Sequence, residues 1–197
     1  MTEPRTAATR AGILAAATAV FADEGVAAAT IGRIAERAGV TRPTVYAYFP
    51  GKDAILHALV ADVRDAFLAA QDAPDADDPV AVARAAITAY LDLHVEHLPL
   101  LAAIDQRART DPAVAAARDE LLTGVHRRNA RFVARLVAAG RADPAVDPAV
   151  VSQAITGIVR RFAELAADSP DRGRWAEDAT RAYLRLVGLP ETPRPVS

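Results

Sequence analysis

The chain has 197 residues, a net charge of -2 and no cysteine, and 52% of its residues are hydrophobic while only 5% are aromatic. A chain of this length forms one domain or two small ones, and the lack of cysteine excludes disulfides, thiolate zinc sites and cysteine nucleophiles. Long apolar runs are absent and the N-terminal segment is polar and contains arginine, so we expect no membrane-spanning helix, no secretory signal and a cytoplasmic protein.

Much of the apolar content is alanine, the residue with the highest helix propensity, which favours a helical and closely packed core. The charge is distributed unevenly: residues 1–52 hold six basic and four acidic residues, and the remainder holds seventeen basic and twenty-one acidic ones. The N-terminal part is therefore the better candidate for contact with nucleic acid. This difference in charge is small, so the assignment of a nucleic-acid contact needs support from residue spacing.

The first predicted helix covers residues 10–24, where apolar residues recur at steps of three and four, the period of one helical face. Gly25 follows as a stop signal, because glycine readily takes the left-handed conformation that ends many helices. The predicted buried face consists of Ile13, Leu14, Ala17, Val20 and Phe21.

Two short helices are predicted next, over residues 30–38 and 41–49. Each begins with a threonine, which caps helix N-termini well, and Pro43 stands in the first turn of the second one, where its missing N–H costs nothing. Gly39 allows a tight turn between them, and Pro50-Gly51 ends the pair. Two short helices joined by a short turn that contains glycine indicate a helix-turn-helix.

Helical periodicity continues through the rest of the chain and no strand pattern is present, so the predicted fold is all-α. A fourth helix begins at Lys52 and gives way to an acidic loop over residues 71–79. Further helices are predicted over residues 80–97, 100–109, 113–139, 148–167 and 174–187, separated by prolines. We expect a helix-turn-helix DNA-binding domain at residues 1–51, a helical ligand-binding and dimerisation domain at residues 52–188 and a flexible tail at residues 189–197.

Residues 30–56 read TIGRIAERAGVTRPTVYAYFPGKDAIL. Together with residues 13–17 and 21–25, they closely resemble the DNA-binding domain of the TetR family of bacterial transcription regulators. Beyond about residue 60 the chain matches that family only in the number and length of its helices. The resemblance implies a homodimeric repressor that binds a palindromic operator in double-stranded DNA and is released by a small-molecule effector. The implied effector is largely hydrophobic, and no cofactor is expected.

The resemblance also implies that the third helix enters the major groove of DNA while the second lies across it. Arg42, Thr44, Tyr46 and Tyr48 then face the DNA. Arg42 is able to form two hydrogen bonds with O6 and N7 of guanine, and its alternative role is that of a solvated arginine at a helix start. Tyr46 and Tyr48 either donate to phosphates or pack on the domain.

The remaining candidate DNA contacts each have a structural alternative. Pro43 offers apolar surface to a thymine methyl group or only sets the helix start. Lys52 stands where the family binds phosphate, and it begins a helix whose N-terminus also attracts anions; otherwise it is a solvated charge. Thr30 and Thr41 are first of all helix caps, and their hydroxyl groups are further candidates for phosphate contact.

The last two predicted helices carry apolar stripes at steps of three and four. Paired across a two-fold axis they form a four-helix dimer interface, and the alternative is ordinary core within one chain. The predicted interface residues are Val151, Ile155, Ile158, Phe162, Trp175, Ala179, Ala182 and Leu186.

Polar groups on otherwise apolar helix faces mark a candidate effector pocket. The predicted ligand-binding residues are Tyr90, His94, His126, Asn129 and Phe132, and each is alternatively a core or rim residue. His94 and His97 have a spacing that suits a metal, but a third ligand is not evident, so we predict no structural metal.

Two other function classes compete with a ligand-responsive regulator. The chain has no glycine-rich phosphate loop, HExxH helix, GxSxG turn or Glu-x-x-His pair, and its four histidines lack a nucleophile-base arrangement, so we predict no enzyme. The second competing class is a DNA-binding regulator whose C-terminal domain binds a protein partner. A small ligand that binds only the native state raises the melting temperature. This measurement distinguishes a ligand-responsive regulator from one that binds a protein partner.

Overall fold

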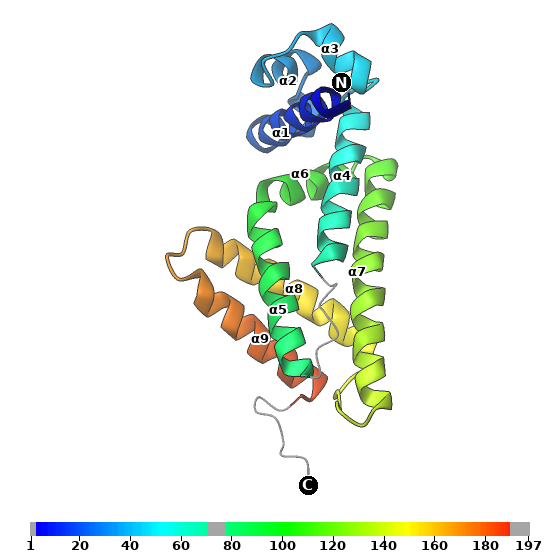
Figure 1. The fold of residues 1–197 in the computed structure, drawn as a ribbon, viewed down its shortest axis with the longest axis vertical. Helices are drawn as coiled ribbons and strands as arrows, with labels where there is room; N and C mark the ends of the chain where they lie inside the picture. The colour runs from blue at the N-terminus through cyan, green and yellow to red at the C-terminus, as the bar shows by residue number, and fades with distance from the viewer. Residues whose placement is uncertain (1–2, 71–77, 190–197) are drawn as a thin grey trace. The chain divides into compact units, whose positions relative to one another are not determined.

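The computed structural model describes residues 3–70 and 78–189 of the chain (Figure 1). These residues form helices and no strand, which confirms the predicted all-α fold class. Residues 71–77 of the predicted acidic loop (71–79) and residues 190–197 of the predicted tail (189–197) lie outside the described residues. The helices are α1 (Glu3–Ala28), α2 (Ile31–Arg37), α3 (Arg42–Tyr48), α4 (Lys52–Ala69), α5 (Pro79–Glu96), α6 (Leu98–Ala108), α7 (Pro112–Ala138), α8 (Pro148–Ala167) and α9 (Arg172–Val187).

Helix α1 begins earlier than the sequence pattern predicted, at Glu3 instead of residue 10. Residues 6–8 in this extension are exposed and include Ala7 and Ala8, so high helix propensity extends the helix where no apolar face is needed. The predicted stop at Gly25 is present as a kink: this residue has a φ of 76° and a ψ of 154°, and a short helical segment follows as far as Ala28.

Within the described residues, one helical segment, Thr6–Ala28, is long and apolar enough to match a membrane span by length and composition. The sequence analysis predicted no such segment. The apolar residues Ile13, Ala17, Val20 and Phe21 of this segment are buried in the chain's own core. A buried core helix rich in alanine passes the same test as a membrane span.

Packing divides the chain into two compact units, which are described separately. Unit 1 comprises Met1–Arg64 and Pro99–Leu121, and unit 2 comprises Asp65–Leu98 and Leu122–Ser197. These limits differ from the predicted division after residue 51, because α4 and α7 each continue from one unit into the other. The predicted division remains a prediction about which segments bind DNA and which bind ligand.

In unit 1, α1 packs on α2 and α2 packs on α3. The core between them is apolar and fully enclosed. It includes Ile13, Phe21, Ile34, Val45 and Ile55, each at 0% exposure. The two short helices are thus held by burial, since helices of seven residues have little stability of their own.

In unit 2, α5, α8 and α9 pack against one another. Their buried faces meet in a core of branched aliphatic side chains and alanine, together with two tyrosines. The residues include Leu91, Val151, Val159, Ala163, Ala179, Tyr183 and Leu184.

Candidate DNA-binding surface and ligand cavity

Threonine caps fix the starts of α2 and α3, as predicted. The Thr30 Oγ1 accepts a hydrogen bond from the Arg33 N–H at 3.3 Å, and the Thr41 Oγ1 accepts one from the Thr44 N–H at 3.3 Å. The hydroxyl groups of Thr41 and Thr44 are 2.8 Å apart. Gly39 closes the turn between the two helices with a φ of 65°, a conformation that favours glycine.

Two arginines of α2 form ion pairs with the end of α1. Arg33 Nε lies 2.9 Å from a Glu24 carboxylate oxygen, and Arg37 Nη1 lies 2.8 Å from one of Asp23. All four side chains are at least partly exposed, so each pair contributes little to stability. Among the cations that the described chain places on α2 and α3, only Arg42 has no acidic partner.

The guanidinium of Arg42, at the start of α3, lies across α2 at Gly32. A Cβ atom at Gly32 would be 3.0 Å from Arg42 Nε and only 2.7 Å from Nη2, and the second distance is shorter than real Cβ contacts. The missing side chain at Gly32 therefore allows Arg42 to take this position. The Arg42 side chain is exposed, so its N–H donors are available on the surface that α2 and α3 share.

The other predicted DNA contacts differ in exposure. Tyr46 is 56% exposed, the largest value among the large apolar side chains of the described chain. Pro43 is exposed and Tyr48 is half-buried, whereas Val45 and Phe49 are buried in the core. The outward surface of α3 thus offers an arginine, a proline ring and a tyrosine hydroxyl to a partner.

Lys52 does not point its ammonium into solvent. Nζ lies 3.0 Å from the carbonyl oxygen of Val26, 2.9 Å from that of Ala27 and 3.2 Å from that of Ala29. An ammonium has three N–H donors, so all of them are used. Helix α1 ends at Ala28, so these carbonyls have no helical N–H partner, and their partial negative charge attracts the cation. Lys52 therefore joins the start of α4 to the end of α1, and its predicted phosphate contact stays a prediction.

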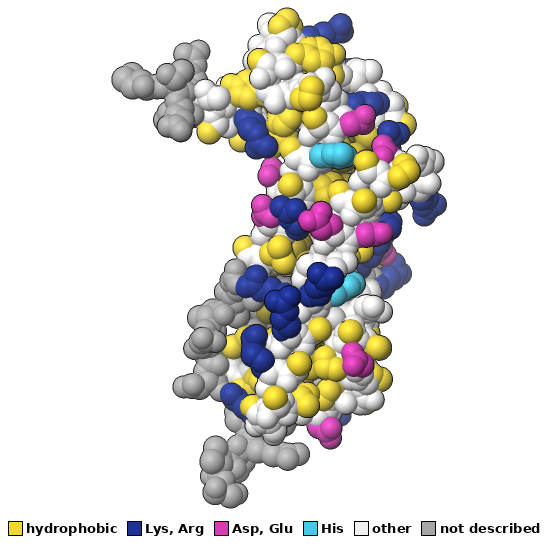
Figure 2. All heavy atoms as spheres, turned by 90° about the vertical axis from the view of Figure 1, so that its right-hand side faces the viewer, with side chains coloured by type: hydrophobic (Ala, Val, Ile, Leu, Met, Phe, Trp, Pro, Cys, Tyr) yellow, Lys and Arg dark blue, Asp and Glu magenta, His cyan; other side chains and the backbone are white. Residues whose placement is uncertain are grey.

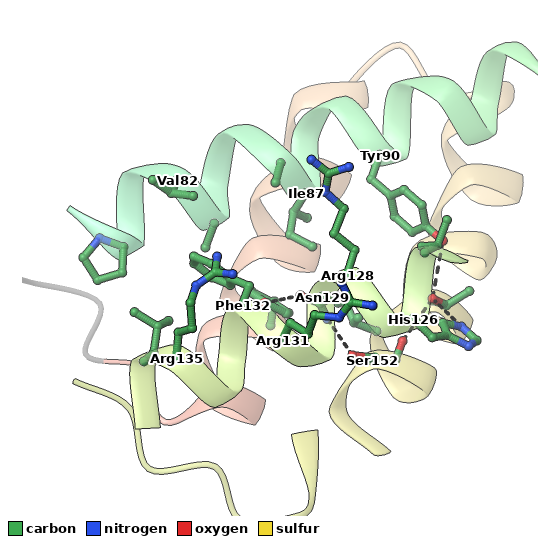
Figure 3. A pocket seen from close by; sticks show the side chains of 18 of the residues that line it. Val82, Ile87, Tyr90, His126, Arg128, Asn129, Arg131, Phe132, Arg135 and Ser152 are labelled. Carbon is green, nitrogen blue, oxygen red and sulfur yellow. Dashed lines mark hydrogen bonds between the residues drawn. The ribbon is translucent and has the colours of Figure 1, made fainter. Parts of the chain in front are cut away.

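Unit 2 contains a cavity of about 600 Å³. The structure brings four of the five predicted ligand-binding residues to its wall, namely Tyr90, His126, Asn129 and Phe132 (Figure 3). They lie on α5 and α7. Apolar residues of α5, α7 and α8 complete much of the wall, and the volume is typical of small-molecule sites.

A hydrogen-bonded network holds the polar side chains at one end of the cavity. The Thr156 hydroxyl donates to the Ser152 carbonyl at 3.0 Å, so its oxygen accepts from the Tyr90 hydroxyl at 3.4 Å and from His126 Nε2 at 3.2 Å. Burial raises the pKa of Tyr90 to about 12 and lowers the pKa of His126. Both groups are therefore neutral near pH 7.

A second network fixes the orientation of Asn129. The Tyr183 hydroxyl donates to Asn129 Oδ1 at 2.6 Å, Asn129 Nδ2 donates to Ser152 Oγ at 3.0 Å, and Ser152 Oγ donates to the Pro148 carbonyl at 2.9 Å. Burial raises the pKa of Tyr183. The network satisfies buried polar groups and presets the shape of the wall.

His94 does not line the cavity, which corrects its predicted role. It is 6% exposed and packs on the rings of Phe67 and Tyr90, with centroids 4.6 Å and 4.5 Å away. Its Nδ1 is 2.9 Å from the Tyr90 carbonyl, to which it donates. Burial lowers the pKa of His94 to about 4, so it is a neutral core residue near pH 7.

Sequence reasoning missed the arginines around the cavity. Arg128, Arg131 and Arg135 of α7 line it, together with Arg141. Figure 2 views the molecule from the side on which α7 lies in Figure 1, and Lys and Arg side chains gather over the lower part of that face. The signal was present in the sequence: arginines spaced three and four apart flank Asn129 and Phe132 on one helix.

The structure separates the predicted dimer residues into two groups. Val151 and Ala179 are fully buried and Ile155 is 3% exposed, so these three belong to the core of a single chain and are corrected. The apolar stripes on these two helices are wider than a dimer interface needs, and their buried residues pack on other helices of the same chain. The half-buried remainder consists of Ile158, Phe162, Trp175, Ala182 and Leu186.

Phe162 and Trp175 join α8 to α9 on this outer side, with ring centroids 5.2 Å apart. Leu165 and Val150 of α8 add exposed apolar surface, at 37% and 48% exposure. We refer to the half-buried residues Ile158, Phe162, Trp175, Ala182 and Leu186 as the outer stripe. Among the described residues, no group of three or more histidine, cysteine, aspartate or glutamate side chains is arranged to hold a metal ion.

The N-terminal helices form a capped helix-turn-helix, and its second helix is exposed. This arrangement is typical of the helix-turn-helix DNA-binding proteins. Residues 13–59 match the family model described as bacterial regulatory proteins, tetR family. Residues 13–59 therefore form a DNA-binding segment of the TetR type, which confirms the resemblance read from residues 30–56.

Two curated relatives from Pseudomonas putida match the N-terminal part of the chain. The HTH-type transcriptional regulator SrpR and the uncharacterized HTH-type transcriptional regulator TtgW are each 49% identical to it over 53 residues. These matches span 27% of this chain, 25% of SrpR and 40% of TtgW. They support the prediction that the chain is a regulator and not an enzyme.

A solved structure matches almost the whole chain. It is SmeT, the repressor of the Stenotrophomonas maltophilia multidrug efflux pump SmeDEF, at a TM-score of 0.72 and 27% identity. The comparison covers 98% of this chain and 99% of SmeT. The likeness therefore extends through unit 2, beyond the DNA-binding segment.

Lys52→Met tests the structural role of this residue. Removal of the ammonium leaves the carbonyls of Val26, Ala27 and Ala29 without a charged donor, so the variant is expected to lose about 1–3 kcal/mol of stability. Chemical denaturation measures the loss, and amide hydrogen exchange at residues 26–30 locates it in unit 1.

Salt dependence provides the control for this prediction. If Lys52 binds three carbonyls, the log-log slope of DNA affinity against salt stays that of the unmodified protein. A log-log slope that is lower by about one, together with an unchanged stability, contradicts this role. That result supports the predicted phosphate contact instead.

Proposed function

We propose that the chain is a homodimeric transcription repressor that binds a palindromic operator through α2 and α3 and is released when a small molecule occupies the cavity of unit 2. Its place of action is the cytoplasm. The observation that carries the proposal is the exposed surface of α3 in a helix-turn-helix of this family, with Arg42 extended across Gly32. Repression is also the activity of SmeT, with 27% identity over nearly the whole chain.

The DNA contacts are expected on the surface shared by α2 and α3. Arg42 supplies N–H donors for a guanine edge, Pro43 supplies apolar surface for a thymine methyl, and Tyr46 supplies a hydroxyl for a phosphate. Thr44 and Tyr48 are weaker candidates, because the Thr44 hydroxyl is already close to that of Thr41 and Tyr48 is half-buried.

The dimer is expected to form through the outer stripe of α8 and α9. A palindromic operator requires two copies of α3 one helical turn of DNA apart, which a two-fold dimer provides. The outer stripe offers aromatic and aliphatic side chains that are half-exposed in the single chain, as an interface between identical subunits requires.

The effector is expected in the cavity between α5, α7 and α8, in contact with Tyr90, His126, Asn129 and Phe132. Helix α4 connects the two units covalently, because its first residues belong to unit 1 and its last to unit 2. Ligand that displaces this helix in each subunit changes the spacing of the two recognition helices without altering any contact to DNA.

Arg42→Ala tests the assignment of the recognition surface. The loss of one bidentate base contact is expected to remove about 1–3 kcal/mol of discrimination between the operator and scrambled DNA. The operator is first selected from genomic fragments by the unmodified protein, and affinities are then measured on both DNAs at one salt concentration. A variant that keeps the original ratio of affinities contradicts the base contact.

Gly32→Ala provides a second, independent check of the same contact. The new methyl group must displace the Arg42 guanidinium, so operator preference falls although alanine favours the helix. Gly12→Ala is the matched control, because a Cβ atom added to this residue of α1 meets open space. It should leave operator preference intact.

Phe162→Asp tests the outer stripe. A carboxylate without a partner in an apolar interface costs several kcal/mol, so the variant is expected to be a folded monomer by light scattering and circular dichroism. Gln153→Asp is the control, because it adds the same charge at an exposed position of α8 outside the stripe. If the Phe162 variant stays dimeric, the interface lies elsewhere.

Thermodynamic linkage tests release by an effector. For any ligand found to bind the cavity, affinity is measured with and without operator DNA, and operator affinity with and without ligand. The two ratios are expected to agree, at about 5- to 150-fold weaker binding. Equal ligand affinity for the free and the operator-bound dimer rules out release by this ligand.

A further inference from the structure

The cavity of unit 2 has an apolar wall on which a hydrocarbon or aromatic body can be buried. Val82 and Ile87 come from α5, Phe132 and Leu136 from α7, and Ile155 from α8. Burial of apolar surface favours binding but does not select among head groups of different charge. Selection by charge must come from the polar residues of the wall.

All the charged residues on the wall are arginines. Arg128, Arg131, Arg135 and Arg141 line the cavity, and no aspartate or glutamate is present among its described lining residues. Arg131 and Arg135 stand one turn apart on α7, and neither forms an ion pair within the described chain. The positive charge at the cavity is therefore not neutralised by the wall itself.

The polar groups at the other end are neutral and mostly satisfied. Tyr90 and His126 both donate to Thr156, and Asn129 is held between Tyr183 and Ser152. Figure 3 shows Tyr90 and His126 near one end of the cavity and Arg135 near the other, with Arg131 between them on α7. The site thus has a neutral end, an apolar wall and a cationic rim.

We propose that this cavity binds an amphipathic anion, with its apolar body against α5, α7 and α8 and its carboxylate or phosphate group on Arg131 and Arg135. The inference rests on the proposed function of the cavity as an effector site, and it adds a charged head group to the largely hydrophobic effector expected from the sequence. Guanidinium groups bind carboxylate and phosphate oxygens with paired, charge-assisted hydrogen bonds. A cationic amphipath of the same size is repelled by the positive charge of these arginines.

The test uses four compounds that share a ten-carbon chain and differ in head group: decanoate, decyl phosphate, decanol and decyltrimethylammonium. Binding to the full chain without DNA is measured by calorimetry and by the shift in melting temperature, below the concentrations at which the compounds form micelles. Decanoate or decyl phosphate is expected to bind at least about tenfold more tightly than decanol, since charge-assisted hydrogen bonds exceed neutral ones. The anion that binds more tightly shows whether the site prefers a carboxylate or a phosphate head group.

Two variants locate the head group. The double variant Arg131→Gln, Arg135→Gln is expected to bind the preferred anion about tenfold more weakly and to bind decanol unchanged. Arg127→Gln is the matched control, because Arg127 is an exposed arginine of α7 that does not line the cavity. It removes one positive charge from the same helix and should leave anion affinity unchanged.

Three results overturn the inference: decanol binding as tightly as the anions, tighter binding of the ammonium compound, or no binding of any of the four. An equal loss of anion affinity in Arg127→Gln and in the double variant overturns the assignment to Arg131 and Arg135. Failure of the proposed function is a separate result: the anion then binds the protein as expected, but operator affinity does not change when it is added.

Discussion

The contact between the Lys52 ammonium and three backbone carbonyls is the constraint on which the DNA-binding unit depends. Helix α1 ends at Ala28, so the carbonyls of Val26, Ala27 and Ala29 lack helical partners. Lys52 satisfies them and is itself the first residue of α4. The segment that contains α2 and α3 is therefore closed at both ends by one side chain, which limits how far α3 moves relative to α1.

Local signals explain why the helices of this chain could be predicted. The positions of α2 and α3 follow from Thr30, Thr41, Pro43 and Gly39, whose preferences act within a few residues and are all realised in the structure. Apolar periodicity located α4 to α9 for the same reason. The start of α1 was missed because residues 6–8 are exposed, so no buried face marks this part of the helix.

The site residues whose surroundings differ from the expectation depend on contacts between distant segments. The carbonyls bound by Lys52 lie 23 to 26 residues earlier in the chain, and only the fold brings them together. Val151, Ile155 and Ala179 lie on stripes wide enough to serve both a chain's own core and a partner, and spacing does not say which part faces inward. His94 matched the pattern of a pocket residue, but packing on Phe67 and Tyr90 places it in the core.

Helix α8 has three surfaces with different roles, and this bears on how a ligand acts. Ser152 and Thr156 line the cavity, Val159 lies in the core, and Ile158 and Phe162 lie on the outer stripe. A helix packed in a dense core shifts as one body rather than residue by residue. A ligand that displaces Thr156 therefore also displaces Phe162, less than two turns further along the same helix. If the outer stripe forms the dimer, ligand alters the angle between subunits directly, in addition to any movement of α4.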